Sequence, residues 1–193
     1  MTNIITIVQG GKMKLKRLLI TVFTLLMMSV CANSMAGDFA DGPVIFGYGK
    51  HTPVQQDMKL EKSVELKVVF DVSQANKDGG LNRGYDSVAR FLNMHVANGV
   101  PIENIHLAIV VHGSATNEMR NDKAYKAKYA KENPNMELLS RLLKNGVQIV
   151  QCGQSAAYYQ LANQDMIQGV DMVLSAMTAH AILAQNGYSQ NPF

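Results

Sequence analysis

The sequence predicts one α/β domain with a mostly parallel β-sheet that is covered by helices on both faces. Two observations predict it. Short runs rich in β-branched residues alternate with stretches in which apolar residues recur at helical spacing, and such alternation is typical of a parallel sheet. One of the runs, Ile105–Val111, is almost continuously apolar, as expected of a strand that is buried on both faces.

The first 36 residues have the pattern of a cleaved secretory signal peptide. Four basic residues lie between Lys12 and Arg17, an apolar run covers Leu18–Val30, and Ser34–Ala36 supplies small residues at the cleavage position. The apolar run is short for a membrane-spanning helix. We therefore expect cleavage after Ala36 and a periplasmic or otherwise secreted protein.

Two further features of this segment bear on anchoring and on the start of translation. Met28–Cys31 lacks the small residue that precedes a lipidated cysteine, so we expect no stable membrane anchor. Met13 is an alternative first residue, which would leave residues 1–12 outside the precursor.

Removal of residues 1–36 changes the charge and the cysteine content. Four of the 18 Lys and Arg residues lie there and none of the 15 Asp and Glu residues, so the mature charge is 14 − 15 = −1. A basic precursor is therefore no argument for a nucleic acid partner, and we expect none. Cys31 is removed as well, so Cys152 has no partner for an intramolecular disulfide.

Residues 37–63 are predicted to form an irregular leader, because Gly and Pro are frequent there. A short apolar run in it, Val44–Phe46, is either an edge strand or a tether, and His51 is interpreted as a solvated loop residue. The domain proper is expected over residues 64–193. It begins with a β-branched strand over Glu65–Val72.

The next helix is predicted from Tyr85 to Val96, since apolar residues recur there every three or four positions, and Asn98-Gly99 ends it. After the Ile105–Val111 strand, the charged stretch Asn117–Glu132 predicts an exposed helix. A short amphipathic helix follows over Met136–Leu143.

The third strand, Val147–Val150, leads directly into Cys152. A helix over Ala156–Ala162, a fourth strand over Gly169–Leu174 and a last helix over Ala176–Gln185 complete the pattern.

Cys152 is the principal candidate for chemistry. Gly153, Gln154 and the potential helix cap Ser155 follow it, so the thiol would face the N–H groups that begin a helix. Those groups and the helix dipole favour thiolate over thiol. The alternative is a small apolar residue that ends a buried strand, since free cysteine is often buried.

The carboxyl ends of parallel strands form the ligand crevice of such sheets. They would bring Cys152–Ser155 together with Asp71, Ser73 and His112-Gly113. His112 is a candidate to hydrogen-bond the thiolate or to move a proton, and the alternative is a residue that only caps its strand. His95 and His180 are expected to be structural.

No cofactor is expected. The glycines match neither a phosphate loop nor the dinucleotide-binding fingerprint. Cys152 and His112 alone do not define a metal site, so we expect no metal. The methionines of the mature chain are not clustered and are interpreted as core residues.

Four segments together resemble the DsrE/DsrF-like sulfur-relay family over roughly residues 64–190. They are Lys67–Asp71, Val110–Gly113, Val150–Ser155 and the closing segment Ala176–Tyr188. The resemblance implies a three-layer, flavodoxin-like α/β fold and assembly into trimers or hexamers. It also implies persulfide sulfur on a cysteine that follows a strand, which is the position of Cys152. Relay members of that family work in the cytoplasm beside partner subunits, whereas this chain is predicted to be exported.

Three functions follow, in order of preference. In the first, Cys152 carries sulfur from a donor to an acceptor protein, His112 assists proton transfer, and Gly153, Gln154 and Ser155, with Gly113, Asp71 and Ser73, bind the substrate. The second is a non-catalytic oligomeric binding or assembly module. The third is a thiol redox protein, which the lack of a second mature cysteine weakens.

Overall fold

The computed structural model describes residues 38–192. The predicted signal peptide, its cleavage after Ala36 and the alternative start at Met13 lie outside the described residues. Within them, no helix is both long and apolar enough to cross a membrane.

The centre of the domain is a five-stranded sheet in the order β4-β3-β2-β1-β5. All four neighbouring pairs are parallel. The strands are β1 (Leu66–Val72), β2 (Ile105–Val111), β3 (Gln148–Cys152), β4 (Asp171–Val173) and β5 (Ser189–Asn191). The fold is thus the expected three-layer, flavodoxin-like α/β fold, although the strand order differs from the 2-1-3-4-5 order of flavodoxin itself.

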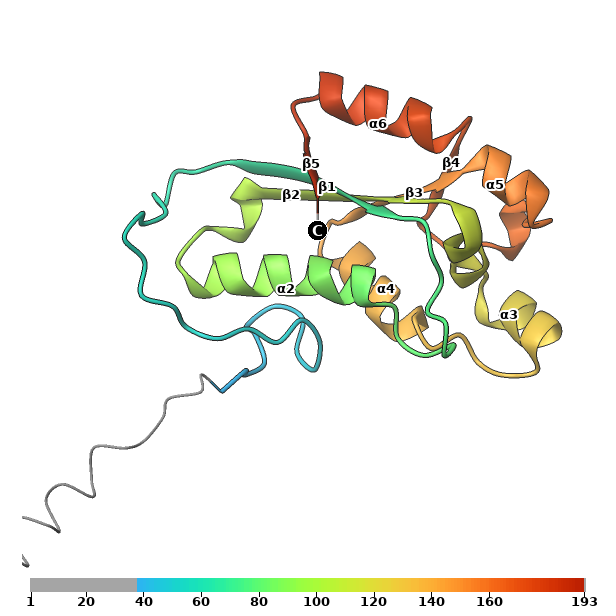
Figure 1. Ribbon diagram of the computed structural model, residues 1–193, viewed down its shortest axis with the longest axis horizontal. Coiled ribbons are helices and arrows are strands. Elements are labelled where there is room, and N and C mark those ends of the chain that lie inside the picture. Colours follow the sequence, from blue (N-terminus) through green and yellow to red (C-terminus); the bar gives the residue numbers. More distant parts are fainter. Residues whose placement is uncertain (1–37, 193) are drawn as a thin grey trace, which may run out of the picture. The chain divides into compact units, whose positions relative to one another are not determined.

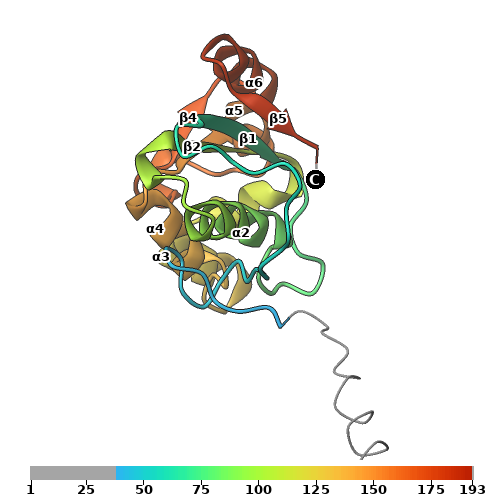
Figure 2. The ribbon, with the colours of Figure 1, turned by 90° about the vertical axis from the view of Figure 1, so that its left-hand side faces the viewer.

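Helices cover both faces of this sheet (Figures 1 and 2). They are α2 (Arg83–Ala97), α3 (Asp122–Tyr129), α4 (Met136–Lys144), α5 (Gly153–Tyr158) and α6 (Ala176–Gln185), with 3-10 turns at Ile102–Asn104, Gly113–Met119 and Asn163–Asp165. Figure 1 shows α2 and α4 below the sheet and α6 above it. The chain crosses the sheet in one direction from β1 to β4 and then returns to β5. Because such crossovers are right-handed, the return helix α6 lies on the opposite face.

Alternation along the strands divides the core into two clusters. On the α2 and α4 face, the strands contribute Phe70, Val72, Ile109, Val111 and Ile149, which pack with Tyr85, Leu92, Leu138 and Leu142 of the helices. On the α6 face, they contribute Val69, Ala108, Val110 and Val150, which pack with Ala179 and Leu183. Odd-numbered and even-numbered positions of one strand therefore face different helices.

The leader is held on α2 by one buried side chain. Asn93 accepts the backbone N–H groups of Val44 and Ile45 at 3.1 and 2.8 Å and donates to the carbonyl of Ile45 at 3.1 Å. Ile45 is fully buried. The Val44–Phe46 run is therefore a tether and not an edge strand. His51 is half-buried and pairs with Ala40 through the backbone, so its interpretation as a solvated residue was wrong.

The helix predicted over Asn117–Glu132 is shorter than expected, although its lysines are exposed as predicted. Only Asp122–Tyr129 is α-helical, and Asn121 caps it by accepting the N–H of Ala124 at 2.9 Å. Glu118, Arg120 and Tyr125 are buried. The charged groups of Glu118 and Arg120 are hydrogen-bonded to other loops in the interior, which a count of charged residues does not reveal.

The remaining differences concern short elements. The helix expected over Ala156–Ala162 starts earlier, at Gly153, and ends at Tyr158. Strand β4 covers only Asp171–Val173 of the expected Gly169–Leu174. The polar strand β5 was not predicted, and it pairs with β1 from Val68↔Ser189 to Phe70↔Asn191.

Candidate functional site

Cys152 is the last residue of β3, where it pairs with Val173 of β4. It lies an even number of positions from Val150, so its side chain points to the α6 face. The residue is only 5% exposed. The thiol therefore lies where the sequence predicted, at the end of a strand, but it is buried in the single chain.

Two opposing influences act on the pKa of the Cys152 thiol. Burial raises it, whereas hydrogen bonds from the backbone N–H and hydroxyl of Ser155 and from the backbone N–H groups of Ala176 and Gln154 lower it. The hydrogen bonds dominate, and the pKa lies below its ordinary value. The donors belong to the starts of α5 and α6, so both helices stabilise a charge on the sulfur.

The Ser155 hydroxyl joins the thiol to the end of β2. Its oxygen accepts the N–H of Gly113 at 3.1 Å, which leaves its own proton for the sulfur of Cys152. Gly113 has a φ of +52°, and a Cβ there would collide with the carbonyl of Ser73. Glycine is therefore required for this turn to bring its N–H to Ser155.

Gly153 allows the turns after β3 and β4 to approach each other. A Cβ on Gly153 would lie 2.6 Å from the carbonyl oxygen of Val173 and 3.2 Å from that of Leu174. Ala156 of α5 packs in the cluster on the α2 and α4 face, whereas α6, which follows β4, covers the other face. Cys152 thus lies at the point where successive connections separate to opposite faces, the usual place for a ligand in such folds.

A second polar group lies at the ends of β1 and β2. Both carboxylate oxygens of Asp71 face Nε2 of His112, at 3.0 and 3.2 Å. Nε2 of His180, on α6, lies 2.7 Å from the same carboxylate. All three side chains are between 23% and 32% exposed. Asp71 therefore joins the ends of two strands to the helix above them.

The pKa of Asp71 reflects these contacts. Burial raises it, but the hydrogen bonds from His180 and His112 and the attraction of both imidazoles outweigh burial, so the pKa is lowered. With Nε2–H donated to an ionised carboxylate, the remaining nitrogen of each ring, Nδ1, is the proton acceptor. Asp71 thus orients two proton acceptors, Nδ1 of His112 at the end of β2 and Nδ1 of His180 on α6.

Asp71, His112 and the Cys152 thiol lie on the same face and at the same end of the sheet. The N–H of His112 still donates to the carbonyl of Val72 at 3.1 Å, so His112 extends the strand pairing beyond β2. Asp71, His112 and Cys152 occupy positions of the same parity as Val69, Val110 and Val150, which all face α6. Neighbouring strands lie about 4.8 Å apart, so the three residues form a row along the sheet edge.

His180 is the residue of this group that the sequence did not indicate. It was expected to be structural, yet it bonds to Asp71, 109 positions away in the chain. A histidine in an apolar helix gives no sign of such a partner. His95, in contrast, bonds to the carbonyl of Phe91 at 2.7 Å, and burial lowers its pKa, which agrees with a structural role.

For the other predicted substrate-binding residues, Gln154 and Ser73, the structure shows no side-chain hydrogen bond to Cys152 or His112. Gln154 is exposed, and its amide donates to the carbonyl of Leu174 at 3.3 Å. Ser73 contributes its carbonyl, which accepts the N–H of Ala115 at 3.4 Å. Across the part of the chain that the structure describes, no set of three or more histidine, cysteine and carboxylate side chains has the arrangement of a metal site.

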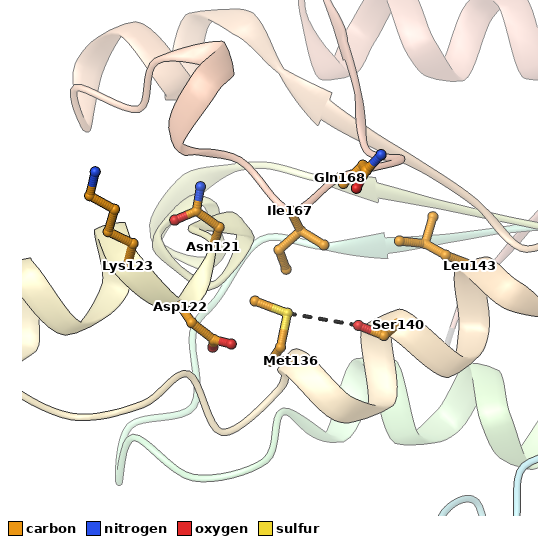
Figure 3. A pocket seen from close by; sticks show the side chains of 8 residues that line it. All are labelled: Asn121, Asp122, Lys123, Met136, Ser140, Leu143, Ile167 and Gln168. Carbon is orange, nitrogen blue, oxygen red and sulfur yellow. Dashed lines mark hydrogen bonds between the residues drawn. The ribbon is translucent and has the colours of Figure 1, made fainter.

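A larger pocket lies away from the thiol (Figure 3). It encloses about 560 Å³ and is lined by Asn121, Asp122, Lys123, Met136, Ser140, Leu143, Ile167 and Gln168. Figure 3 shows Met136 and Ile167 pointing into it and Ser140 bonded to the Met136 sulfur, an interaction of 3.8 Å. Its lining contains neither a cysteine nor a histidine, so we assign the chemistry to the residues around Cys152.

Comparisons with known proteins gave similar solved structures and a matching family. A structure titled as a protein of unknown function, MTH1491 from Methanobacterium thermoautotrophicum, has a TM-score of 0.48 and 16% identity over 66% of this chain and 98% of that one. The ychN protein from E. coli has a TM-score of 0.44 and 15% identity over 65% of this chain and 96% of its own. A search of curated proteins found no match. The model of the DsrE/DsrF-like family matches residues 67–190, which is more than half of the sequence, and the chain therefore belongs to the DsrE/DsrF-like family.

Proposed function

We propose that this protein carries sulfur as a persulfide on Cys152. Its family suggests a role related to sulfur relay. The observation that carries the finer proposal is the lowered pKa of the Cys152 thiol at the end of β3, where donors from two helices surround the sulfur. A thiolate is the nucleophile that attacks a sulfane sulfur.

The proposed transfer needs no net oxidation. The Cys152 thiolate attacks the outer sulfur of a donor persulfide, so a bond forms between that sulfur and Sγ while the donor S–S bond breaks. Nδ1 of His112, whose ring Asp71 orients, first accepts the proton of the Cys152 thiol and then returns it to the departing donor thiolate. In the second step an acceptor thiolate attacks the same outer sulfur, and Cys152 leaves as the thiolate that the N–H groups near Ser155 stabilise.

Transfer also requires access to a thiol that is buried in the single chain. Three residues near the thiol are 79%, 71% and 81% exposed: Tyr158 on α5, Leu174 in the turn after β4, and Met177 on α6. Exposed apolar side chains of this size favour contact with another protein surface. We propose that a sulfur donor or acceptor protein docks there and shifts the turn at Leu174.

We also propose that the chain forms a homo-oligomer, a trimer or hexamer, through α6. Its sequence, Ala176–Gln185, contains no Lys, Arg, Asp or Glu, and Met177 and Ile182 are exposed on its outer side. Large exposed apolar side chains on a helix without charged residues favour burial against another protein surface. The expected export would place this oligomer in the periplasm or outside the cell, and amino-terminal sequencing of the exported protein should then begin at Gly37.

The second candidate function is a non-catalytic oligomeric binding module. The observation that favours it is the 5% exposure of Cys152, because a sealed thiol would serve only as a core residue. The two proposals differ in one measurable property, which is whether the thiol accepts sulfur in the folded protein.

Intact-protein mass spectrometry after incubation with polysulfide tests the proposal. The sulfur-carrier function predicts a gain of one sulfur atom on the wild type that is absent from Cys152→Ser and is removed by a reductant. If the folded wild type gains no sulfur while the urea-unfolded protein does, the thiol is sealed and the binding-module function stands instead.

A further inference from the structure

Arg120 is a buried cation with no acidic partner among the described residues. The residue is 6% exposed. One terminal nitrogen, Nη2, donates to the carbonyls of Tyr159 and Gln160 at 2.6 and 3.3 Å, and Nε donates to the Asn117 side chain at 3.4 Å. No carboxylate of residues 38–192 lies within 4 Å of the guanidinium. A buried charge without a counter-charge is costly, so this arginine calls for an explanation.

The guanidinium borders a cavity of about 360 Å³ between α3 and the Asn163–Asp165 turn. The lining consists of Arg120, Lys123, Ala124, Ala127, Lys128 and Asp165. Three of these side chains are cationic and one is acidic, which leaves an excess of two positive charges. The second terminal nitrogen of Arg120, Nη1, makes no hydrogen bond among the described residues. This atom is not fully buried, so a small ligand can reach it.

The two lysines lie where they can share a ligand with Arg120. Lys123 and Lys128 are both on α3 and both exposed. In Figure 3 the Lys123 side chain points away from Met136 and Ser140, out of the larger pocket. Burial, and then the nearby charge of Arg120, lowers the pKa of Lys128. Like charges this close repel, and an anion between them would remove that repulsion.

We propose that Arg120, Lys123 and Lys128 form a binding site for a divalent tetrahedral oxyanion, a sulfur oxyanion or a phosphate group. A guanidinium donates charge-assisted hydrogen bonds to the oxygens of such a group. Nη1 supplies two N–H donors, and the lysines neutralise the remaining charge from the α3 side. The bonds from Nη2 to the Tyr159 and Gln160 carbonyls hold the guanidinium in place before the anion arrives.

This site is separate from the thiol. Cys152 immediately precedes α5, whereas the carbonyls that hold Arg120 follow its other end. The six residues of α5 rise about 9 Å. An anion bound at Arg120 is therefore too far from the Cys152 sulfur to contact it. Oxyanion binding at Arg120 and sulfur transfer at Cys152 can therefore fail or succeed independently.

The test is a titration of the ¹⁵N-labelled protein that follows the Nε–H resonance of Arg120. Sodium sulfate, thiosulfate and phosphate are added in separate arms at constant ionic strength, with sodium chloride as the reference. We expect a saturable shift with the divalent anions and none with chloride. Tighter binding of sulfate and thiosulfate than of phosphate would identify a sulfur oxyanion as the ligand, and the reverse order would identify a phosphate group.

Exposed lysine variants keep the test independent of folding, because removal of the buried Arg120 could unfold the chain. Losing two charge-assisted contacts in Lys123→Gln/Lys128→Gln should weaken binding at least about tenfold. Lys126→Gln, on the same helix but outside the cavity lining, should change it less than about twofold, and Cys152→Ser should bind as the wild type does. The proposal would be overturned if the Arg120 chemical shift never saturated with anion concentration. It would also be overturned if Lys126→Gln lost as much affinity for the anion as the double variant, or if Cys152→Ser lost affinity.

Discussion

The Ser155 hydroxyl acts between two neighbours, because it accepts the N–H of Gly113 and donates to the Cys152 sulfur. Its removal separates the effect of hydrogen bonding on the thiol from the effect of burial. Ser155→Ala deletes one donor to the thiolate and leaves the backbone donors in place. We expect the pKa of Cys152 to rise and its alkylation by iodoacetamide at pH 7 to become several times slower, measured as rate against pH.

Ser140→Ala is the matched control for this variant, since Ser140 lies on α4 and its hydroxyl bonds to the Met136 sulfur (Figure 3). It should alkylate at the wild-type rate. An unchanged rate in Ser155→Ala would show that the hydroxyl does not tune the thiol.

Asp71 gives a prediction for acid stability. Its pKa in the folded protein is lowered, so the native state binds the proton less tightly than the unfolded chain does. The stabilisation is therefore complete above the unfolded pKa and is lost as the pH falls through the folded pKa. Asp71→Asn should cost about 1 kcal/mol at neutral pH, discounted for partial exposure, and nothing once the carboxyl is protonated.

Urea unfolding at a series of pH values measures this difference, and the exposed Asp171→Asn on β4 serves as the control. The ¹⁵N spectra of the His112 and His180 rings provide a second reading, because loss of the carboxylate should release both from the Nε2–H tautomer. Equal stability of wild type and Asp71→Asn at neutral pH, with unchanged tautomers, would mean that Asp71 orients neither ring.

The residues at the strand ends were predictable because parallel strands end at one edge of a sheet. Asp71, His112 and Cys152 were placed correctly on that ground. His180 was not, since it comes from a helix and its bond to Asp71 depends on how α6 crosses the sheet. The sequence left open whether Cys152 is buried, because its burial depends on the close approach of two turns that Gly153 allows.

The β3–α5 turn should tolerate no side chain at its first helical residue. Gly153→Ala places a Cβ 2.6 Å from the Val173 carbonyl oxygen, so backbone must shift at a cost of about 1–3 kcal/mol. Thermal unfolding should show a lower midpoint. Gly80→Ala is the control, because the nearest atom to its Cβ is the Asn76 amide nitrogen at 3.9 Å. Equal midpoints for the two variants would contradict the close approach of the turns.

The outer side of α6 gives a prediction about assembly. Met177 is 81% exposed on a helix without charged residues, and Met177→Glu should make its burial against a second copy costly. Sedimentation velocity should show an oligomer for the wild type and a smaller species for the variant. Met58→Glu, at an equally exposed methionine of the leader, should leave the oligomer intact. A wild-type monomer throughout the micromolar range would refute the proposed assembly.

The longer elements were predictable from their apolar residues, whereas the short polar ones were not. Ile105–Val111 and Ala176–Gln185 have the predicted bounds, because each is a predominantly apolar run from end to end. Strand β5 has the sequence Ser-Gln-Asn and is held by backbone pairing to β1, so its side chains carry no signal. The burial of Glu118 and Arg120 in the charged stretch before α4 was missed, because it depends on hydrogen bonds to distant loops inside the domain.

At the scale of the whole molecule, the reversal of the chain after β4 produces the site. The return of α6 across the sheet to β5 brings His180 to Asp71 and the start of α6 to Cys152. Movement of this one helix would change both groups together. The thiol, the two histidines and the proposed assembly surface therefore all depend on the position of α6.

The most direct test of the central claim is a measurement of transferable sulfur on the folded protein. The protein is loaded with polysulfide, freed of excess reagent, and treated with cyanide, which removes sulfane sulfur as thiocyanate. A persulfide carrier should release about one thiocyanate per chain, while Cys152→Ser should release none and Ser140→Ala as much as the wild type. Release of no thiocyanate from folded wild type, or of equal amounts from wild type and Cys152→Ser, would contradict sulfur carriage on Cys152.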